Sequence, residues 1–137
     1  MATVSQLTPY TCTSLIFLGD EAIKRAITTR DGYIKRYYHA RGEHVRKIQR
    51  VMALYYELEA GWAPSDVLVD VDPPGKGVFG RQTEMDLWNY QGYFKLLPAS
   101  GRADGICGPQ TLKHMDAYWR DNRPFHLGFD AITRQAF

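Results

Sequence analysis

The chain has 137 residues, 45% of them hydrophobic and 23% charged, which is the composition of a single globular domain with a modest extension. Its net charge of +2 gives no strong argument for binding nucleic acid or for attraction to an anionic membrane. No apolar stretch approaches the ~20 residues that cross a bilayer, and no positive charge precedes the short apolar run at residues 15–18, as it would in a signal peptide. We therefore expect synthesis in the cytoplasm, with another delivery route for any role outside it.

The first half of the chain predicts two helices separated by a less regular segment. Residues 14–29 fit a helix with a small apolar face, and residues 33–40 fit either a strand or, slightly better, a helix. A stronger helix is predicted from Glu43 to near Ala60, where Gly61 is suited to cap its C-terminus. The apolar positions on these helical faces are Ile23, Ala26, Ile27, Val45, Ile48, Met52 and Tyr55.

The second half predicts a long connection, two more helices and a packed tail. Residues 61–76 contain three of the seven prolines, so they form a connection rather than a helix, with room for a short strand at residues 67–69. Helices are expected from about residue 81 to 96 and from residue 109 to about 120. Their apolar faces are Leu87, Tyr90, Phe94 and Leu97 in the first and Leu112, Met115 and Trp119 in the second. The segment 125–137 is apolar enough that we expect it to pack back onto the domain.

A short motif, G-x-x-G-x-Q-T, occurs twice, each time just before a predicted helix. It begins at Gly77 and again at Gly105, and every matched position lies 28 residues further on. Two glycines three apart suit a tight turn, and the second glycine can open the helix that follows. A repeated turn and helix indicate that two helices enter one core in related ways. The residues assigned to this structural role are Gly77, Phe79, Gly80, Thr83, Gly105, Gly108, Pro109 and Thr111.

Cysteine and histidine spacing gives no indication of a metal, cofactor or redox site. Cys12 and Cys107 lie far apart and outside any Cys-x-x-Cys motif, so two buried free thiols in a reducing compartment are a simpler interpretation than a disulfide. A zinc hydrolase needs convergent ligands and a base, and no H-x-x-x-H or H-E-x-x-H spacing links the histidines. The four histidines are His39, His44, His114 and His126. We predict neither a metal nor a cofactor.

Several short motifs follow one another over residues 43–119. V-x-x-I-Q-x-x-M begins at Val45, G-V-F-G-x-x-T at Gly77, Y-Q at Tyr90 and D-G-I-C-G-P-x-T at Asp104. This series resembles the three-helix peptidoglycan-binding domain family. The family pattern has V-x-x-L-Q-x-x-L, D-G-x-F-G-x-x-T and F-Q, often followed by a second turn, D-G-x-x-G-P-x-T.

The resemblance implies a mainly α fold. It predicts a small three-helix peptidoglycan-binding-like bundle at residues 43–120, a partly helical N-terminal extension at residues 1–42 and a packed C-terminal tail at residues 121–137. The chain departs from the family pattern at Lys76, where the first turn usually has Asp, and at Asp86, where the second helix usually has a small apolar residue. The connection before the first turn is also longer than usual. These departures concern the ligand groove more than the fold.

The resemblance also implies a non-catalytic module that binds bacterial peptidoglycan or its fragments, and we expect it to act as a stand-alone protein. Aromatic rings near the turns could stack on sugar faces while polar groups hydrogen-bond the ligand. The candidate ligand-binding residues are Gln82, Arg102, Asp104, Gln110, Tyr118 and Trp119. Neither nucleic acid binding nor membrane insertion is expected, and action in the periplasm or at the cell wall would need a route other than a cleaved signal.

Two other functions stay open on the sequence. An accessory protein of a phage or a contractile secretion apparatus could reuse the fold and bind a protein partner. A small cell-wall hydrolase would need two carboxylates across a cleft, although Asp is common in turns. The candidate carboxylates are Glu57, Glu59, Asp66, Asp70 and Asp72. Basic and aromatic residues alternate over residues 35–50, which fits single-stranded nucleic acid or, better at this net charge, a solvated helix face.

Overall fold

The computed structural model describes residues 9–60, 77–98 and 101–122, and these residues are mainly helical. The α-helices are α1 (Glu21–Thr28), α2 (Glu43–Tyr55), α4 (Arg81–Tyr93) and α5 (Pro109–Asn122), and a π-helical turn, η1 (Tyr56–Ala60), extends α2. Over the described ranges there is no strand, and extended residues meet only in isolated bridges. The predicted mainly α class is confirmed.

The three predicted helix starts at Glu43, Arg81 and Pro109 are correct. The first predicted helix is correct only from Glu21 onward, because residues 15–19 form a turn instead. The short strand suggested at residues 67–69 and the packed tail lie outside the described residues.

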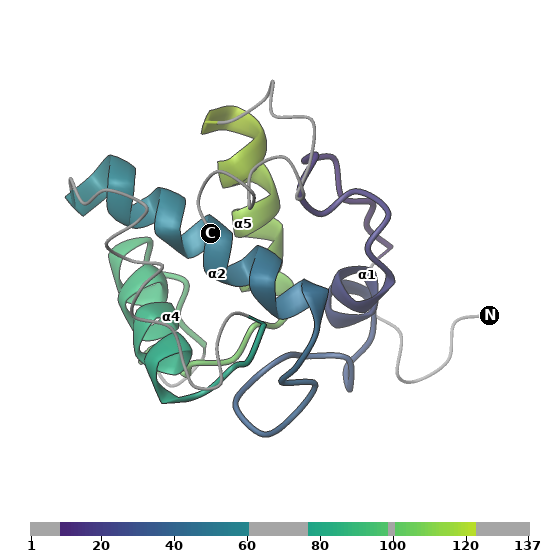
Figure 1. Cartoon of the computed structure of the whole chain (residues 1–137), viewed down its shortest axis with the longest axis horizontal. Coiled ribbons are helices and arrows are strands. Elements are labelled where there is room, and N and C mark those ends of the chain that lie inside the picture. The colour runs from purple at the N-terminus through teal and green to yellow at the C-terminus, as the bar shows by residue number, and fades with distance from the viewer. Residues whose placement is uncertain (1–8, 61–76, 99–100, 123–137) are drawn as a thin grey trace.

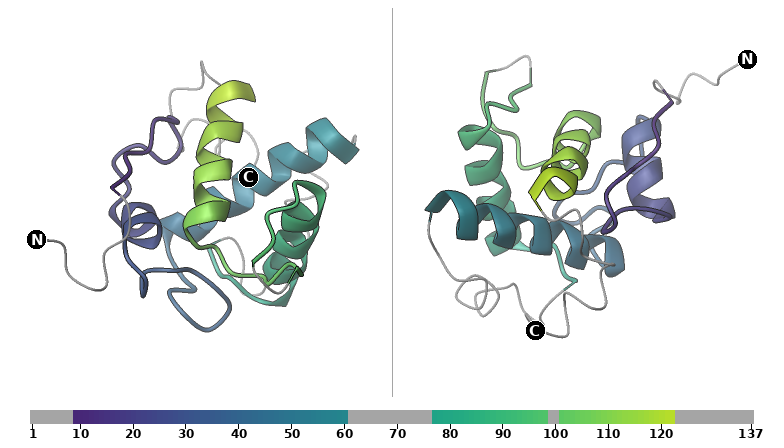
Figure 2. Two further views of the ribbon diagram at one scale, coloured as in Figure 1. Left: turned by 180° about the vertical axis from the view of Figure 1, so that it is seen from behind. Right: turned by 90° about the horizontal axis from the view of Figure 1, so that it is seen from above.

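Helices α2 and α5 cross at the centre of the molecule. Figure 1 shows α2 running across the view, with α4 near its left end and α1 near its right end, and the view from above in Figure 2 places α5 between α4 and α1. Contacts join α5 to both α1 and α2, and α2 to α4. The predicted apolar faces supply the core between these helices. The fully buried residues among them are Ile23, Ala26, Ile27, Val45, Ile48, Met52, Leu87, Leu112, Met115, Tyr90 and Trp119.

A buried carboxylate on α5 holds the segment that precedes α1. Asp116 is fully buried, and its Oδ1 accepts a hydrogen bond from the N–H of Ser14 at 2.9 Å. Its Oδ2 accepts from the hydroxyl of Tyr10 at 2.7 Å and from the N–H of Thr13 at 3.1 Å. Burial alone would raise the pKa of this carboxyl, but the hydrogen bonds outweigh burial and lower the pKa below its ordinary value. The segment before α1 is therefore anchored to the last described helix.

An aspartate caps α1 and joins it to α2. The Oδ1 of Asp20 accepts a hydrogen bond from the N–H of Ile23 at 3.0 Å, which satisfies one of the free donors at the helix start. The Oδ2 of Asp20 pairs with the ammonium of Lys47 at 2.8 Å, and both side chains are largely shielded from solvent. Together these contacts fix the position of α1 relative to α2.

Residues 33–42, here called the linking segment, form neither a strand nor a helix, so the predicted regular structure is wrong. Tyr37 and His39 have left-handed backbone angles, with φ of 73° and 52°, which a right-handed helix excludes. Lys35 and Tyr38 exchange two backbone hydrogen bonds of 3.1 Å and 3.0 Å, which close a tight turn. The segment leads from α1 to α2 through this turn.

Helix α4 ends earlier than predicted, at Tyr93. Lys95 has a left-handed φ of 56°, and the N–H of Leu96 bonds to the carbonyl of Gln91 at 2.8 Å, as in the Schellman motif that ends many helices. This turn redirects the chain, so Leu96 is buried and Leu97, which the helical pattern had placed in the core, is only half-buried.

Candidate functional site

The first repeated turn is held by a glutamine from α2. Gln49 is buried, and its Oε1 accepts a hydrogen bond from the N–H of Gly77 at 2.9 Å. Its Nε2 donates to the carbonyl of Val78 at 3.1 Å and to the hydroxyl oxygen of Thr83 at 3.0 Å. One amide thus satisfies polar groups at both ends of the turn and fixes the start of α4 against α2.

The second repeated turn is held in the same way by a glutamine from α4. Gln91 is buried, and its Oε1 accepts a hydrogen bond from the N–H of Gly105 at 3.0 Å. Its Nε2 donates to the carbonyl of Ile106 at 3.0 Å and to the hydroxyl oxygen of Thr111 at 3.1 Å. This amide fixes the start of α5 against α4.

The two turns therefore repeat in three dimensions as well as in sequence. Each glutamine bonds the same three groups of its turn, and the matched groups lie 28 residues apart. Gly77 and Gly105 both have left-handed φ values, of 90° and 70°. The bonding role of Gln49 and Gln91 was not predicted from the sequence. One sequence signal could have pointed to this role: each glutamine directly follows a core-facing residue of a predicted helix. An amide at the edge of a core is often buried, and a buried amide needs hydrogen-bond partners.

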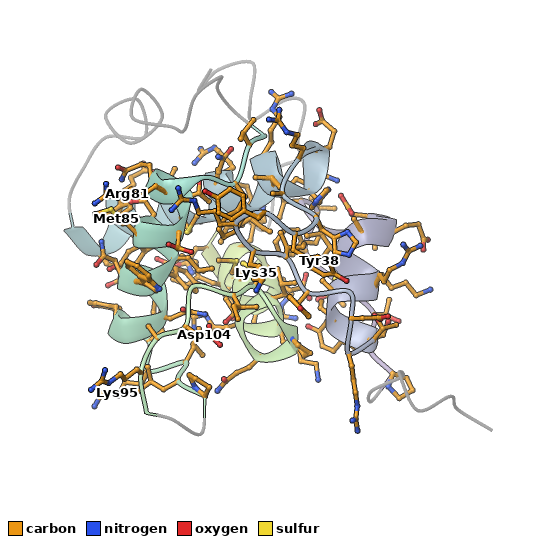
Figure 3. The ribbon with its side chains drawn as sticks, turned by 90° about the horizontal axis from the view of Figure 1, so that it is seen from below. Lys35, Tyr38, Arg81, Met85, Lys95 and Asp104 are labelled. Atoms are coloured by element: carbon orange, nitrogen blue, oxygen red, sulfur yellow. The ribbon has the colours of Figure 1, made fainter. Side chains whose placement is uncertain are left out.

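The linking segment pairs with both turns at equivalent positions. The N–H of Phe79 donates to the carbonyl of Ala40 at 2.8 Å, and the N–H of Cys107, 28 residues on, donates to the carbonyl of Ile34, also at 2.8 Å. The segment therefore ties the two turns together by backbone hydrogen bonds. Figure 3 views this side of the molecule.

A pocket of about 710 Å³ lies between the linking segment and the first turn. We call it the cationic pocket, because basic side chains predominate in its polar lining. In Figure 3 the labelled Arg81 marks the start of α4, which contributes one wall, while Lys35 and Tyr38 mark the linking segment, which contributes another. The chemically active residues around the pocket are Arg36, Tyr37, His39, Arg41, His44 and Arg81.

The candidate ligand residue Gln82 is already bonded within the fold. Its Nε2 donates to the Oδ1 of Asp86 at 3.1 Å, and the same carboxylate oxygen accepts the hydroxyl of Tyr56 at 2.9 Å. Burial raises the pKa of that phenol. Asp86, which departs from the family pattern, thus has polar partners from both α4 and the π-helical turn η1.

Three further candidates surround the second turn. The Oδ1 of Asp104 accepts hydrogen bonds from the N–H of Ile106 at 2.9 Å and from the Nε2 of Gln91 at 3.0 Å, which is the turn-stabilising role that Asp commonly has. Arg102 and Gln110 are exposed. These two side chains keep the accessibility that a ligand contact requires.

Tyr118 and Trp119 occupy different environments. Trp119 is fully buried in the core, so its ring has no face open to a ligand. Tyr118 is half-buried among aromatic rings that include Tyr90 and His114, and its hydroxyl donates to Glu59 at 3.3 Å. Burial, together with the nearby Glu59 carboxylate, raises the pKa of the Tyr118 phenol. Burial also lowers the pKa of His114, whose Nδ1 lies 2.7 Å from the hydroxyl of Tyr90.

Two aromatic rings near the turns are exposed, and neither was among the ligand-binding candidates chosen from the sequence. Tyr37, on the linking segment, is 85% exposed and lines the cationic pocket. Trp88, on α4, is 43% exposed and lies against Gly105, since a Cβ at that glycine would be 2.6 Å from the indole nitrogen. A run of basic and aromatic residues marked Tyr37 in the sequence, but its backbone conformation could not be read from that run.

The two cysteines are buried and unpaired, as predicted. Burial raises the pKa of Cys12 to about 12 and also raises the pKa of Cys107. In the part of the chain that the structure describes, no group of three His, Cys, Asp or Glu side chains is placed to hold a metal ion. None of the helices described has the length and apolarity that crossing a membrane requires.

Comparison with known proteins gave no match to this chain among family models, curated proteins or solved structures.

Proposed function

We propose that the chain is a non-catalytic module that binds bacterial peptidoglycan, with α2, α4 and α5 forming a three-helix unit like that of the peptidoglycan-binding domain family. The observation that carries this proposal is the duplicated turn held by a buried glutamine. The bonded residues in each copy are the glutamine, glycine and threonine of the motif series from which the resemblance was inferred.

This observation supports the proposal because it gives motif residues that are scattered in sequence one common role, which is to hold the start of a helix. Chance similarity of short motifs provides no reason for Gln49 to meet Gly77 and Thr83, or for Gln91 to meet Gly105 and Thr111. A shared hydrogen-bond arrangement at both turns supports treating the motif series as one structural unit.

The departure at Asp86 leaves this arrangement intact. Asp86 accepts hydrogen bonds from Tyr56 and Gln82, and neither of these residues is among the partners by which Gln49 and Gln91 hold the two turns. Lys76 lies outside the described residues. The exposed groups near the turns that we assign to ligand contacts are Tyr37, Trp88, Arg102 and Gln110. Aromatic faces beside hydrogen-bonding side chains suit a sugar–peptide polymer.

Sedimentation with purified insoluble peptidoglycan tests the proposal directly. We expect most of the protein to sediment with peptidoglycan at modest salt and to stay in the supernatant with chitin, which has a related sugar backbone but no peptide. Protein that stays in the supernatant with peptidoglycan would overturn the proposal and favour the accessory role with a protein partner. Clearing of a wall suspension by the protein would instead indicate a hydrolase.

A further inference from the structure

We propose that the cationic pocket is the subsite for an anionic group of the wall polymer, either a carboxylate of the peptide stems or a phosphate of a wall-linked polymer. This inference rests on the proposed function and adds to it the chemistry of one site. The pocket volume of about 710 Å³ falls within the range of small-molecule sites and accommodates a sugar or short peptide unit that carries the charge.

The charge of the lining is the first argument. Arg36, Arg41 and Arg81 line the pocket together with His39 and His44, and no Asp or Glu lines it among the described residues. A guanidinium presents several N–H donors in a planar fork that matches a carboxylate or a phosphate, so Arg is well suited to recognise either group.

The pairing of the basic residues is the second argument. Three basic side chains in the described part of the chain are neutralised by a carboxylate: Arg46 by Glu43, Lys47 by Asp20 and Arg120 by Asp121. Across those same ranges, none of the three pocket arginines lies within ion-pair distance of a carboxylate.

The backbone adds to the same electrostatic field. Helices α2 and α4 both begin beside the pocket, directly after the cap residues Gly42 and Gly80, so the positive ends of two helix dipoles lie near it. Neither glycine has a side chain that could bring a capping carboxylate or hydroxyl to the helix start. The helix ends strengthen a site that the arginines already define.

The equivalent position at the second turn differs in ways that make it a natural control. A pocket of about 330 Å³ lies there, and its residues Ile106, Gly108 and Pro109 correspond to Val78, Gly80 and Arg81. Proline replaces arginine at the helix start, which removes both the charge and an N–H donor. The basic side chains at this smaller pocket are Arg30 and Lys35.

Two double variants separate a specific site from general charge attraction. Arg41→Gln/Arg81→Gln removes two charges from the cationic pocket, while Arg30→Gln/Lys35→Gln removes two charges from the smaller one. In ~0.1 M salt, where exposed long-range charge effects are largely screened, we expect the first variant to bind walls at least tenfold more weakly and the second to bind within twofold of wild type. Unchanged urea unfolding midpoints will show that both variants are folded.

Chemically altered walls identify the anion. Hydrofluoric acid removes phosphodiester-linked polymers, and carbodiimide coupling with methylamine converts carboxylates to neutral amides. Loss of binding after the first treatment assigns the pocket to phosphate, and loss after the second assigns it to carboxylate. If untreated walls bind but the Arg41→Gln/Arg81→Gln change does not weaken binding, the subsite is wrong and the proposed function stands. If untreated walls do not bind at all, both are wrong.

Discussion

At the scale of single residues, the two buried glutamines have the largest structural consequence for their size. A glutamine side chain carries one acceptor and two donor hydrogens, and both Gln49 and Gln91 use the oxygen and the nitrogen on a turn that lies far away in sequence. Removing the amide takes away the acceptor of the buried N–H of Gly77 or Gly105, which costs more than the bond itself contributes.

Gln91→Met tests this account, because methionine has a similar length but no amide. The N–H of Gly105 and the carbonyl of Ile106 would each lose a buried partner, so we expect the free energy of unfolding to fall by about 3 kcal/mol. Urea unfolding followed by circular dichroism gives the value. Gln110→Met is the matched control, since Gln110 is exposed on α5 and its replacement should change stability by less than about 0.5 kcal/mol. Equal effects of the two changes would contradict the account.

The side chain of Tyr37 is highly exposed and its backbone is strained. These two properties together suit a ligand contact better than a structural role. Its φ of 73° is unfavourable for a tyrosine, and an 85% exposed ring contributes little to the core. Tyr37→Asn should therefore keep the stability of the protein or raise it by up to about 1 kcal/mol, because asparagine tolerates this conformation. The same change should weaken sedimentation with peptidoglycan about three- to tenfold through loss of the ring.

The control for Tyr37→Asn is Lys95→Asn, which places asparagine at a left-handed position after α4, away from the cationic pocket. A similar gain in the urea midpoint is expected there. If Tyr37→Asn lowers stability by more than about 1 kcal/mol, the ring has a structural role. If wall binding is unchanged, the ring is not a ligand contact.

Some residue roles follow from chemistry that acts locally. Asp104, which the resemblance suggested as a ligand contact, stabilises its own turn, as a short polar side chain next to a glycine commonly does. Trp119 was predicted both as a core residue, from its helical spacing, and as a ligand contact. The structure buries its ring fully, so the core prediction is correct and the ligand contact is wrong. Exposure of Tyr37 depended on backbone angles that no local pattern specified.

At the scale of elements, the second turn and α4 are fitted closely together. Gly105 has a φ of 70°, and a Cβ there would lie 2.6 Å from the Trp88 Nε1. Gly105→Ala must therefore strain the backbone and also displace the indole from the turn. The neighbouring Gly101 has a similar φ of 79°, but a Cβ at that position would have nothing within 4 Å.

The pair Gly105→Ala and Gly101→Ala separates backbone strain from steric contact. We expect Gly101→Ala to lower the free energy of unfolding by about 1 kcal/mol, from strain alone. Gly105→Ala should cost about 2–4 kcal/mol, because overpacking adds to that strain. Urea unfolding measures both, and tryptophan fluorescence should shift only in Gly105→Ala. Equal costs would show that the turn and Trp88 adjust freely.

Element boundaries could be predicted to the extent that their causes lie close in sequence. The starts of α2, α4 and α5 follow from glycine before an apolar period, and all three were placed correctly. The linking segment could not be predicted, because its conformation depends on backbone partners at Phe79 and Cys107, about 40 and 70 residues further along the chain. The same non-local pairing forms the cationic pocket.

At the scale of the whole molecule, one core connects parts that the sequence suggested treating separately. Cys12, before α1, and Cys107, in the second turn, belong to the same buried cluster as the faces of α2, α4 and α5. Asp116 and the linking segment add polar connections between the N-terminal residues and the repeated turns. Loss of structure at either thiol therefore involves the common core, and each thiol should report on unfolding of the whole described unit.

The two thiols lead to a prediction about alkaline pH. In the unfolded chain a cysteine ionises near pH ~8.5, whereas burial raises the pKa of Cys12 to about 12 and that of Cys107 also upward in the folded protein. Because the thiol pKa is higher in the folded protein than in the unfolded chain, each thiol contributes its full stabilisation of the fold below pH ~8.5. That contribution is lost as pH rises toward the pKa of the folded state, since only the unfolded chain releases the proton. The free energy of unfolding should therefore fall progressively as pH rises through the unfolded pKa toward pH 10. Urea unfolding under reducing conditions at pH 8, 9 and 10 should show this decline, and Cys12→Ala/Cys107→Ala should remove most of it. Parallel declines in the two proteins would mean that other groups, such as the buried phenols, dominate the alkaline response.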